Sequence, residues 1–240
     1  MNHEKHSIKQ KMKYRLSVII PVYNEQATIE EIIRRVKATG LVSEIIVVDD
    51  GSTDGTQKVL AKLSRKGEII ACIHPKNEGK GKSIRTGIEK ASGDLVLIQD
   101  ADLEYDPRDY PSLIQPILDN LADVVYGSRF LGGPRRPILF WNMVANKILT
   151  FTTNILYNNI LTDMETGYKV FKKEIFNELN IHANRFDFEP EFTAKILKKK
   201  VRIYEVPIRF TPRFYEEGKK IKMKDAFIAF WTLIKYRFVN

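Results

Sequence analysis

The first half of the chain alternates short apolar runs with segments whose apolar residues recur at helical spacing. The apolar runs lie at 16–21, 44–49, 68–73 and 95–98, and the helical segments between them lie at 28–37, 53–63 and 83–91. Near-continuous apolar strands are typical of a parallel sheet that helices cover on both faces. Because parallel strands joined by a helix form right-handed crossovers, this alternation predicts an α/β fold with a Rossmann-like layer.

Acidic side chains follow the last of these apolar runs, where the chain leaves the predicted sheet. Asp100, Asp102 and Glu104 come directly after the run 95–98. The carboxyl edge of such a sheet is where open α/β folds bind ligands. Alternate residues of an extended chain point the same way, so Asp100 and Asp102 can converge on one cation or one metal-bound diphosphate. The pattern predicts metal-assisted chemistry on a phosphorylated substrate; the alternative is a turn with solvated acids.

Two other strand ends carry polar or aromatic residues that suit a nucleotide. The first run leads into 21–25 and the second into 49–55. Tyr23 offers a ring on which a base or sugar can pack, and Asp49 or Asp50 can accept from a base N–H or a ribose hydroxyl. The rest of the second segment also fits a plain turn and helix cap. Neither GxGxxG nor GxxxxGK[ST] is present, which argues against dinucleotide oxidoreductases and P-loop enzymes.

The net charge of +9 is unevenly distributed, and the C-terminal portion is rich in Lys and Arg. Nucleic acid, an anionic membrane and a polyphosphate ligand are partners that such a surface suits, and solubility alone is the plainer explanation. Acidic strand ends would repel a nucleic-acid backbone without a metal, and no recognisable motif interleaves aromatic and basic residues. We therefore expect no nucleic-acid partner.

Three features bear on the location of the protein. Residues 1–13 are polar and basic without an apolar core, which predicts a disordered lead rather than a secretory signal. No apolar segment approaches the ~20 residues that a membrane-spanning helix needs. The single cysteine, Cys72, cannot form an internal disulfide and favours a reducing compartment. Together these features predict a cytoplasmic protein.

Five ordered motifs resemble glycosyltransferase family 2, the nucleotide-sugar transferases of GT-A fold. They lie at 18–25, 47–56, 77–81, 100–104 and 127–129. The resemblance implies an α/β fold with a Rossmann-like, mixed, mostly parallel sheet flanked by helices. It also implies a nucleotide-sugar-binding half at 14–131 and an acceptor-binding half of the same domain at 132–220. A Mg²⁺ or Mn²⁺ ion on Asp100, Asp102 and Glu104 is implied as well. The implied nucleotide-sugar contacts are Pro21, Tyr23, Glu25, Asp49, Asp50, Lys80, Asp100, Ala101 and Asp102.

The segment 163–171 resembles a motif of polyprenyl-phosphate sugar transferases, the group that includes dolichol-phosphate mannose synthase. Thr, Tyr and Lys here replace the Ser, Phe and Arg of that motif, and 186–191 and 205–210 also look like this group. In that group, two arginines that match Arg129 and Arg213 help to bind the acceptor phosphate. The resemblance thus implies Asp100, Asp102, Arg129 and Arg213 as catalytic residues. The implied acceptor-phosphate contacts are Arg129, Thr166, Lys169, Arg213 and Lys219.

The chemistry of sugar transfer also bears on the acceptor. A divalent cation and fixed Arg or Lys residues stabilise a departing diphosphate. A sugar hydroxyl needs a carboxylate base, whereas a phosphate monoester, with a second pKa of ~6, is already ionised. The chain has many cations beyond the predicted sheet and no clear Glu-Asp base, although Asp163, Glu165 or Asp187 could serve. We therefore predict an inverting, metal-dependent transferase that uses a polyprenyl phosphate; the alternative acceptor is a saccharide hydroxyl in glycan or envelope synthesis.

Two segments look like amphipathic helices that suit a bilayer surface. In 141–151, Val144, Ile148 and Phe151 line one side, and the C-terminal helix expected at 221–240 carries aromatic residues at helical spacing between basic ones. Such helices suit a membrane interface, and they equally suit packing on the core or on a second copy. We expect peripheral attachment to the cytoplasmic face of a membrane. The sequence allows a homo-oligomer without indicating one. It also does not identify the sugar or the base of the donor.

Overall fold

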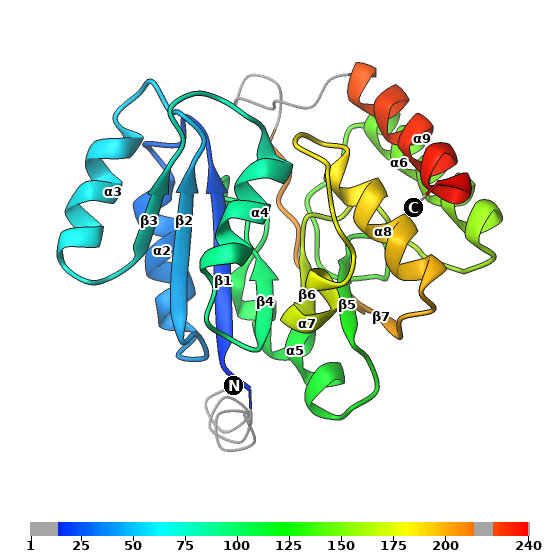
Figure 1. Cartoon of the computed structure of the whole chain (residues 1–240), viewed down its shortest axis with the longest axis horizontal. Helices are drawn as coiled ribbons and strands as arrows, with labels where there is room; N and C mark the ends of the chain where they lie inside the picture. The colour runs from blue at the N-terminus through cyan, green and yellow to red at the C-terminus, as the bar shows by residue number, and fades with distance from the viewer. Residues whose placement is uncertain (1–13, 214–222, 240) are drawn as a thin grey trace.

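The computed structural model describes residues 14–213 and 223–239, so the expected lead at 1–13 and the predicted phosphate ligand Lys219 lie outside the described residues. A seven-stranded sheet runs through the described part in the order β3-β2-β1-β4-β6-β5-β7 (Figure 1). Its strands are β1 (Leu16–Val22), β2 (Glu44–Asp49), β3 (Ile70–Ile73), β4 (Leu95–Ile98), β5 (Val124–Ser128), β6 (Lys169–Lys172) and β7 (Ile203–Pro207).

The predicted mixed, mostly parallel α/β sheet is confirmed. The pairs β1–β2, β1–β4, β2–β3 and β5–β7 are parallel, whereas β6 runs antiparallel to both of its neighbours. Strands from the predicted halves 14–131 and 132–220 belong to this one sheet. The separate binding role assigned to each half stays a prediction.

Helices cover both faces of the sheet, as the near-continuous apolar strands require. They are α2 (Ile29–Ala38), α3 (Thr56–Arg65), α4 (Lys80–Lys90), the short 3₁₀ helix η1 (Pro107–Asp109), α5 (Tyr110–Leu118), α6 (Phe140–Tyr157), α7 (Lys173–Asn177), α8 (Phe188–Lys198) and α9 (Met223–Phe238). Apolar residues of α2, α3 and α5 form one core with the sheet, and those of α4, α6, α8 and α9 form the other. Alternate residues of β1 supply both cores: Val18 and Ile20 face one, and Ile19 faces the other.

Helix α3 begins at Thr56, later than the predicted start at residue 53. Thr53, the predicted first residue of this helix, and its neighbour Ser52 instead connect the loop after β2 to the loop after β1. The Ser52 hydroxyl accepts from the Asn24 amide at 2.8 Å, and the Asn24 side chain in turn accepts from the Thr53 amide at 2.8 Å. These contacts hold two loops together at the carboxyl edge of the sheet, and that role competes with helix formation.

The topology brings the carboxyl ends of β1, β2, β4 and β5 to one edge. Because β6 is antiparallel to β4, with Val170 opposite Leu97, the turn that precedes β6 also reaches this edge. The turn at 163–167 therefore lies beside the acidic segment after β4. The fold thus gathers segments from both halves of the chain around one site.

Candidate active site

A cavity of about 510 Å³ opens at this edge of the sheet, within the usual size range of small-molecule sites. Most of the residues predicted from the sequence line it: Pro21, Tyr23, Glu25, Asp50, Lys80, Asp100, Ala101, Asp102, Glu104, Arg129 and Arg213. Asp49, Thr166 and Lys169 are placed behind its wall rather than on it. The roles assigned to all of these residues stay predictions.

Asp100 is held by a lysine from the start of α4. The Lys80 Nζ lies 2.8 Å from Asp100 Oδ1 and 3.2 Å from Glu189 Oε1. Burial by itself would lower the pKa of Lys80, but the carboxylates of Asp100 and Glu189 more than offset it and hold that pKa above its ordinary value. Lys80 is therefore a fixed cation of the cavity wall.

Asp102 lies among like charges. Burial raises its pKa to about 7, and the carboxylates of Asp100 and Glu104 add to this effect. One of its carboxylate oxygens accepts from the Glu104 amide at 3.1 Å. A carboxylate crowded in this way gains a favourable partner when a divalent cation binds.

The donor set suits a cation that is shared with a substrate. Within 14–213 and 223–239, no three His, Cys, Asp or Glu side chains are arranged to hold a metal by themselves. Mg²⁺ typically uses one or two protein carboxylates together with substrate phosphates. The oxygen ligands of Asp100 and Asp102 fit such a shared site, with Asp102 the less engaged of the two because Asp100 contacts Lys80.

Arg213 ties two distant segments of the cavity wall together. Its guanidinium donates to both oxygens of Glu25, at 3.0 and 2.9 Å, and its Nε donates to the backbone oxygen of Asp102 at 2.8 Å. Its own amide donates to Glu104 at 2.6 Å. The predicted acceptor-phosphate residue thus contacts the predicted nucleotide residue Glu25 and fixes the acidic segment.

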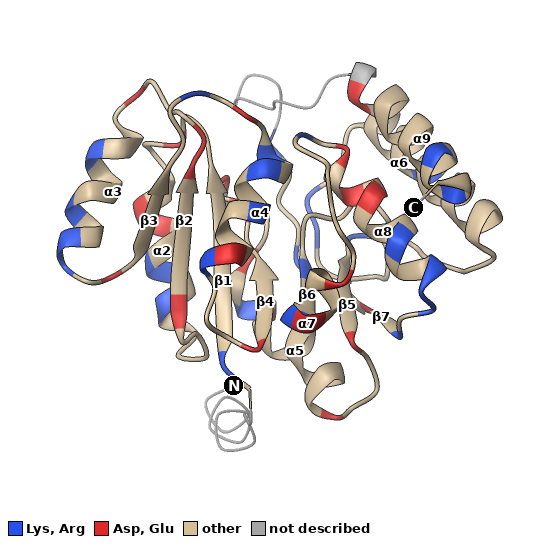
Figure 2. Ribbon diagram, in the orientation of Figure 1, with Lys and Arg blue, Asp and Glu red and all other residues tan. Residues whose placement is uncertain are grey.

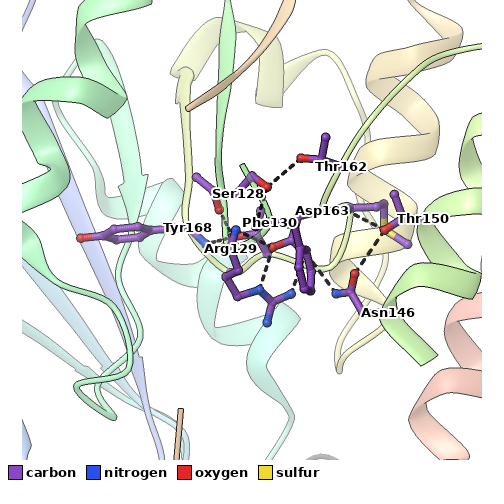
Figure 3. Close-up of polar contacts among 12 residues, drawn as sticks. Ser128, Arg129, Phe130, Asn146, Thr150, Thr162, Asp163 and Tyr168 are labelled. Atoms are coloured by element: carbon purple, nitrogen blue, oxygen red, sulfur yellow. Dashed lines mark hydrogen bonds and ion pairs between the residues drawn. The ribbon is translucent and has the colours of Figure 1, made fainter. Parts of the chain in front are cut away.

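Arg129 forms the second fixed cation of the cavity. Its Nε and one terminal nitrogen each donate to Asp163 at 2.7 Å, as Figure 3 shows. Asp163 is fully buried and also accepts from the Asn146 side chain of α6 at 3.1 Å. Burial would lower the pKa of Arg129, but the Asp163 carboxylate holds that pKa well above its ordinary value. The pairing fixes the guanidinium at the cavity and ties it to α6.

The two aspartates after β2 have different surroundings. Asp50 accepts from the Glu78 and Gly79 amides, at 2.9 and 2.8 Å, and lies 2.9 Å from His74 Nδ1. It therefore holds the loop before α4. Asp49 is fully buried, and its Oδ1 has no hydrogen-bond partner among the described residues.

Buried hydrogen bonds fix the turn before β6. The Lys169 Nζ is buried and donates to the backbone oxygens of Met164 and Thr166. The Thr166 hydroxyl donates to the Gly127 backbone oxygen at 2.6 Å. In the structure, Thr166 and Lys169 therefore shape this turn; their predicted contact with an acceptor phosphate stays a prediction.

Sequence reasoning assigned no role to several residues of the cavity wall, including Tyr105, Gly167 and Glu189. Glu165, which the sequence suggested only as a possible base, also lines the cavity. Gly167 allows the backbone to approach Asp100, because a Cβ there would lie 2.5 Å from Asp100 Oδ2. The Tyr105 hydroxyl accepts from the Gly167 amide at 3.1 Å. In the sequence, Gly167 could have indicated a close approach of the backbone to another segment. The position of Glu189 could not be predicted, because it depends on how α8 packs against the rest of the fold.

Comparisons with known proteins identify the family of the chain. Residues 17–179 match the family described as glycosyl transferase family 2. The chain is 30% identical to UDP-N-acetylglucosamine–dolichyl-phosphate N-acetylglucosaminyltransferase of Methanococcus voltae, over 90% of this chain and 94% of that protein. It is 32% identical to dolichol-phosphate mannosyltransferase of Pyrococcus furiosus, over 89% of this chain but only 61% of that longer protein.

A solved structure supports the same fold. Glucosyl-3-phosphoglycerate synthase from Mycobacterium tuberculosis, in complex with Mn²⁺, UDP and phosphoglyceric acid, superposes with a TM-score of 0.76. The match has 20% sequence identity and covers 98% of this chain and 83% of that one. The likeness shows the fold, and the sequence matches show the family: the chain belongs to glycosyl transferase family 2 and is a glycosyltransferase.

Proposed function

We propose that the protein is an inverting, metal-dependent transferase that moves a hexose from a UDP- or GDP-sugar to a polyprenyl phosphate at a membrane surface. Asp100 and Asp102 would hold Mg²⁺ or Mn²⁺, which when bound offsets the charge of the departing diphosphate. Relatives named as dolichyl-phosphate sugar transferases support this acceptor class. A Haloferax volcanii relative named as a glycan-biosynthesis hexosyltransferase keeps the saccharide alternative open.

The residues of this chain have distinct roles in the proposed reaction. Tyr23 and the loop held by Asp50 would bind the nucleoside. Lys80, fixed between Asp100 and Glu189, would add positive charge beside the diphosphate. Arg129 would hold the acceptor phosphate, which is ionised and needs positioning rather than a base. Of the base candidates, Asp163 is bound to Arg129 and Asp187 accepts from the Arg185 amide.

The observation that carries the lipid acceptor is the orientation of α6. Its inward face includes polar residues: Asn146 is 8% exposed, and Thr150 and Thr153 are also buried. Its outward face is apolar, with Trp141 75% and Phe151 66% exposed. This is the reverse of a helix on a water-facing surface. An apolar outer face with aromatic residues is typical of a helix lying at a bilayer interface.

Helix α9 extends this apolar surface beside α6 (Figure 1). Its Ala229 and Leu233 are buried in the core, whereas Phe227 and Trp231 are exposed. Basic residues, blue in Figure 2, lie near the end of α9. One side of α9 therefore packs on the core and the other exposes aromatic residues, and contact of that exposed side with a membrane is part of the proposal.

Helix α6 connects the apolar surface to the cavity. Asn146 on the inner side of α6 contacts Asp163, which holds Arg129. An α-helix with its side chains is ~10–12 Å across. A lipid lying against the outer face of α6 would be about one helix width from the side that is tied to Arg129, so its phosphate would extend past α6 to meet that guanidinium. No helix of the described ranges is long and apolar enough to span a bilayer.

A transfer assay tests the proposed acceptor. Radiolabelled UDP- and GDP-sugars are incubated with Mg²⁺ and either a short polyprenyl phosphate or a panel of free saccharides. We expect label in the lipid fraction, and we expect its loss when EDTA is present. Transfer to saccharides with none to the lipid would support the alternative acceptor and refute this one.

Membrane attachment gives a separate prediction. The double change Trp141→Ser and Phe151→Ser should weaken binding to anionic phospholipid vesicles by about tenfold or more, because each exposed ring would bury apolar area in the bilayer. Flotation of the protein with vesicles measures this effect. Leu121→Ser is the matched control, since Leu121 is 59% exposed and precedes β5 at the opposite edge of the sheet. Equal binding by all variants would contradict the assignment.

A further inference from the structure

One residue of the acidic segment after β4 has a backbone conformation that L-residues rarely adopt. Leu103, between Asp102 and Glu104, has a φ of 65°. This left-handed conformation is disfavoured for a leucine by about tenfold, and such strain persists only where the surrounding structure holds it. The Leu103 side chain packs against the core rather than lining the cavity. The strain therefore lies in the backbone that orients the carboxylates of Asp102 and Glu104.

Contacts from the segment after β7 hold this strained turn. The Arg213 Nε donates to the backbone oxygen of Asp102 at 2.8 Å, and the Arg213 amide donates to the Glu104 carboxylate at 2.6 Å. The Thr211 amide donates to the backbone oxygen of Glu104 at 2.9 Å. These contacts lie on both sides of Leu103, so they supply the support that a strained residue needs.

Glu25 in turn fixes the guanidinium of Arg213. Its carboxylate oxygens accept from the two terminal nitrogens at 3.0 and 2.9 Å, and the side chains of Glu25 and Arg213 are 10% and 17% exposed. Such a bidentate pair fixes geometry as well as charge. Glu25 is itself anchored, because its amide donates to the Thr56 hydroxyl at 3.1 Å and its carboxylate accepts from the Thr28 hydroxyl at 2.8 Å. A chain of contacts therefore runs from the starts of α2 and α3, through Glu25 and Arg213, to Asp102.

We infer that Glu25 is a positioning residue for the metal: through Arg213 it holds the strained turn at Leu103, and so keeps Asp102 in place before the cation and the nucleotide bind. This inference rests on the proposed function for its metal-bound nucleotide, and it adds a role for Glu25 apart from direct contact with the nucleoside. A carboxylate that is positioned in advance does not have to be ordered when the cation arrives, and this preorganisation appears as affinity. Without Glu25 the turn relaxes, and the cation has to restore it.

Calorimetric titration of UDP and GDP, with Mn²⁺ and with EDTA, tests the inference on the whole chain. The ratio of the two dissociation constants measures how much the metal contributes to nucleotide binding. Glu25→Gln keeps the shape of the side chain and removes the charge that holds Arg213. Glu30→Gln is the matched control, because Glu30 is 62% exposed in the first turn of α2.

Glu25→Gln should lower the contribution of Mn²⁺ by about tenfold, which is the penalty of the strained turn once it is no longer held. Its affinity for the nucleotide in EDTA should stay within about twofold of that of the wild type, since Glu25 acts through Asp102. Arg213→Lys keeps the charge but not the planar fork, so it should lose about as much. The two changes combined should lose no more than either alone, because both break one chain of contacts. The control should match the wild type.

Two changes at Leu103 separate strain from a direct contact. Leu103→Gly and Leu103→Ala both remove the side chain, but only glycine adopts a positive φ without penalty. Added to Glu25→Gln, Leu103→Gly should bring the contribution of Mn²⁺ back to within about threefold of the wild type, whereas Leu103→Ala should not recover it. With Glu25 present and no ligand, the Leu103→Gly protein should melt above the Leu103→Ala protein, which reports the strain without any metal.

An unchanged contribution of Mn²⁺ in Glu25→Gln would overturn the inference and leave the proposed metal site intact. An equal loss of affinity in EDTA would also overturn it, because Glu25 would then contact the nucleotide directly. So would equal results for Leu103→Gly and Leu103→Ala. If the wild type gains no affinity from Mn²⁺, the proposed metal role and this inference are refuted together. The expected binding pattern without transfer to polyprenyl phosphate would refute the proposed acceptor and leave this inference supported.

Discussion

Replacing Asp102 with asparagine is expected to lower kcat by about a thousandfold in millimolar Mg²⁺ or Mn²⁺. The change keeps the shape of the side chain but removes the charge that we propose a cation uses. Asp102 also differs from its neighbour Asp100, which already contacts Lys80. Steady-state transfer with the metal concentration varied measures the effect, and near-normal turnover in the variant would contradict the metal assignment.

The thermal stability of the Asp102→Asn variant distinguishes a loss of metal binding from unfolding of the protein. Burial and the charges of Asp100 and Glu104 raise the pKa of Asp102 to about 7. Its native form therefore binds a proton more readily than the unfolded chain, and the free energy of unfolding falls as pH rises from about 4 to 7. At pH 8 the Asp102→Asn variant should melt at or above the wild-type temperature without metal. Asp119→Asn, an exposed change at the end of α5, is the control and should alter neither property.

Replacing Arg129 with methionine is expected to lower the free energy of unfolding by about 3–5 kcal/mol. The substitution leaves Asp163 fully buried without the guanidinium that now meets both of its oxygens. Chemical denaturation at neutral pH measures the loss. A change of less than about 1 kcal/mol would show that the pair is not the buried, desolvated contact described here.

A second variant separates stability from the proposed role in catalysis. Arg129→Met combined with Asp163→Asn removes both charges and should recover a substantial part of the lost stability. It should not recover transfer, and its KM for the polyprenyl phosphate should stay at least about tenfold above that of the wild type. Its affinity for the nucleoside diphosphate should change little. Full recovery of lipid transfer would leave Arg129 with a structural role only.

The parts of the fold that follow from local pattern were predictable from the sequence. Apolar runs of strand length, each followed by a helical stripe, indicate a parallel sheet, and a parallel sheet places the ends of its strands at one edge. The sequence alone therefore predicts that Tyr23, Asp50 and Asp102 lie at one site, and in the structure all three line the cavity.

Contacts between distant segments were not predictable in the same way. Glu25 and Arg213 pair across 188 positions of the chain, and no local pattern records such a pair. Lys169, whose contact with an acceptor phosphate stays a prediction, lies buried at the start of β6, between β4 and β5 in the sheet, and no local pattern indicates that burial. Periodicity revealed the apolar stripe of 141–151 but could not show that this stripe faces outward, because only packing decides which side of a helix meets the core.

Crystals soaked with Mn²⁺ and UDP or GDP test the central proposal most directly. The account predicts an anomalous Mn²⁺ peak within about 2.0–2.3 Å of an Asp102 oxygen, shared with the diphosphate, and a nucleoside packed on Tyr23. Data collected above and below the manganese absorption edge would identify the ion. A nucleotide bound elsewhere, or bound in this cavity with its Mn²⁺ away from Asp100 and Asp102, would contradict the account.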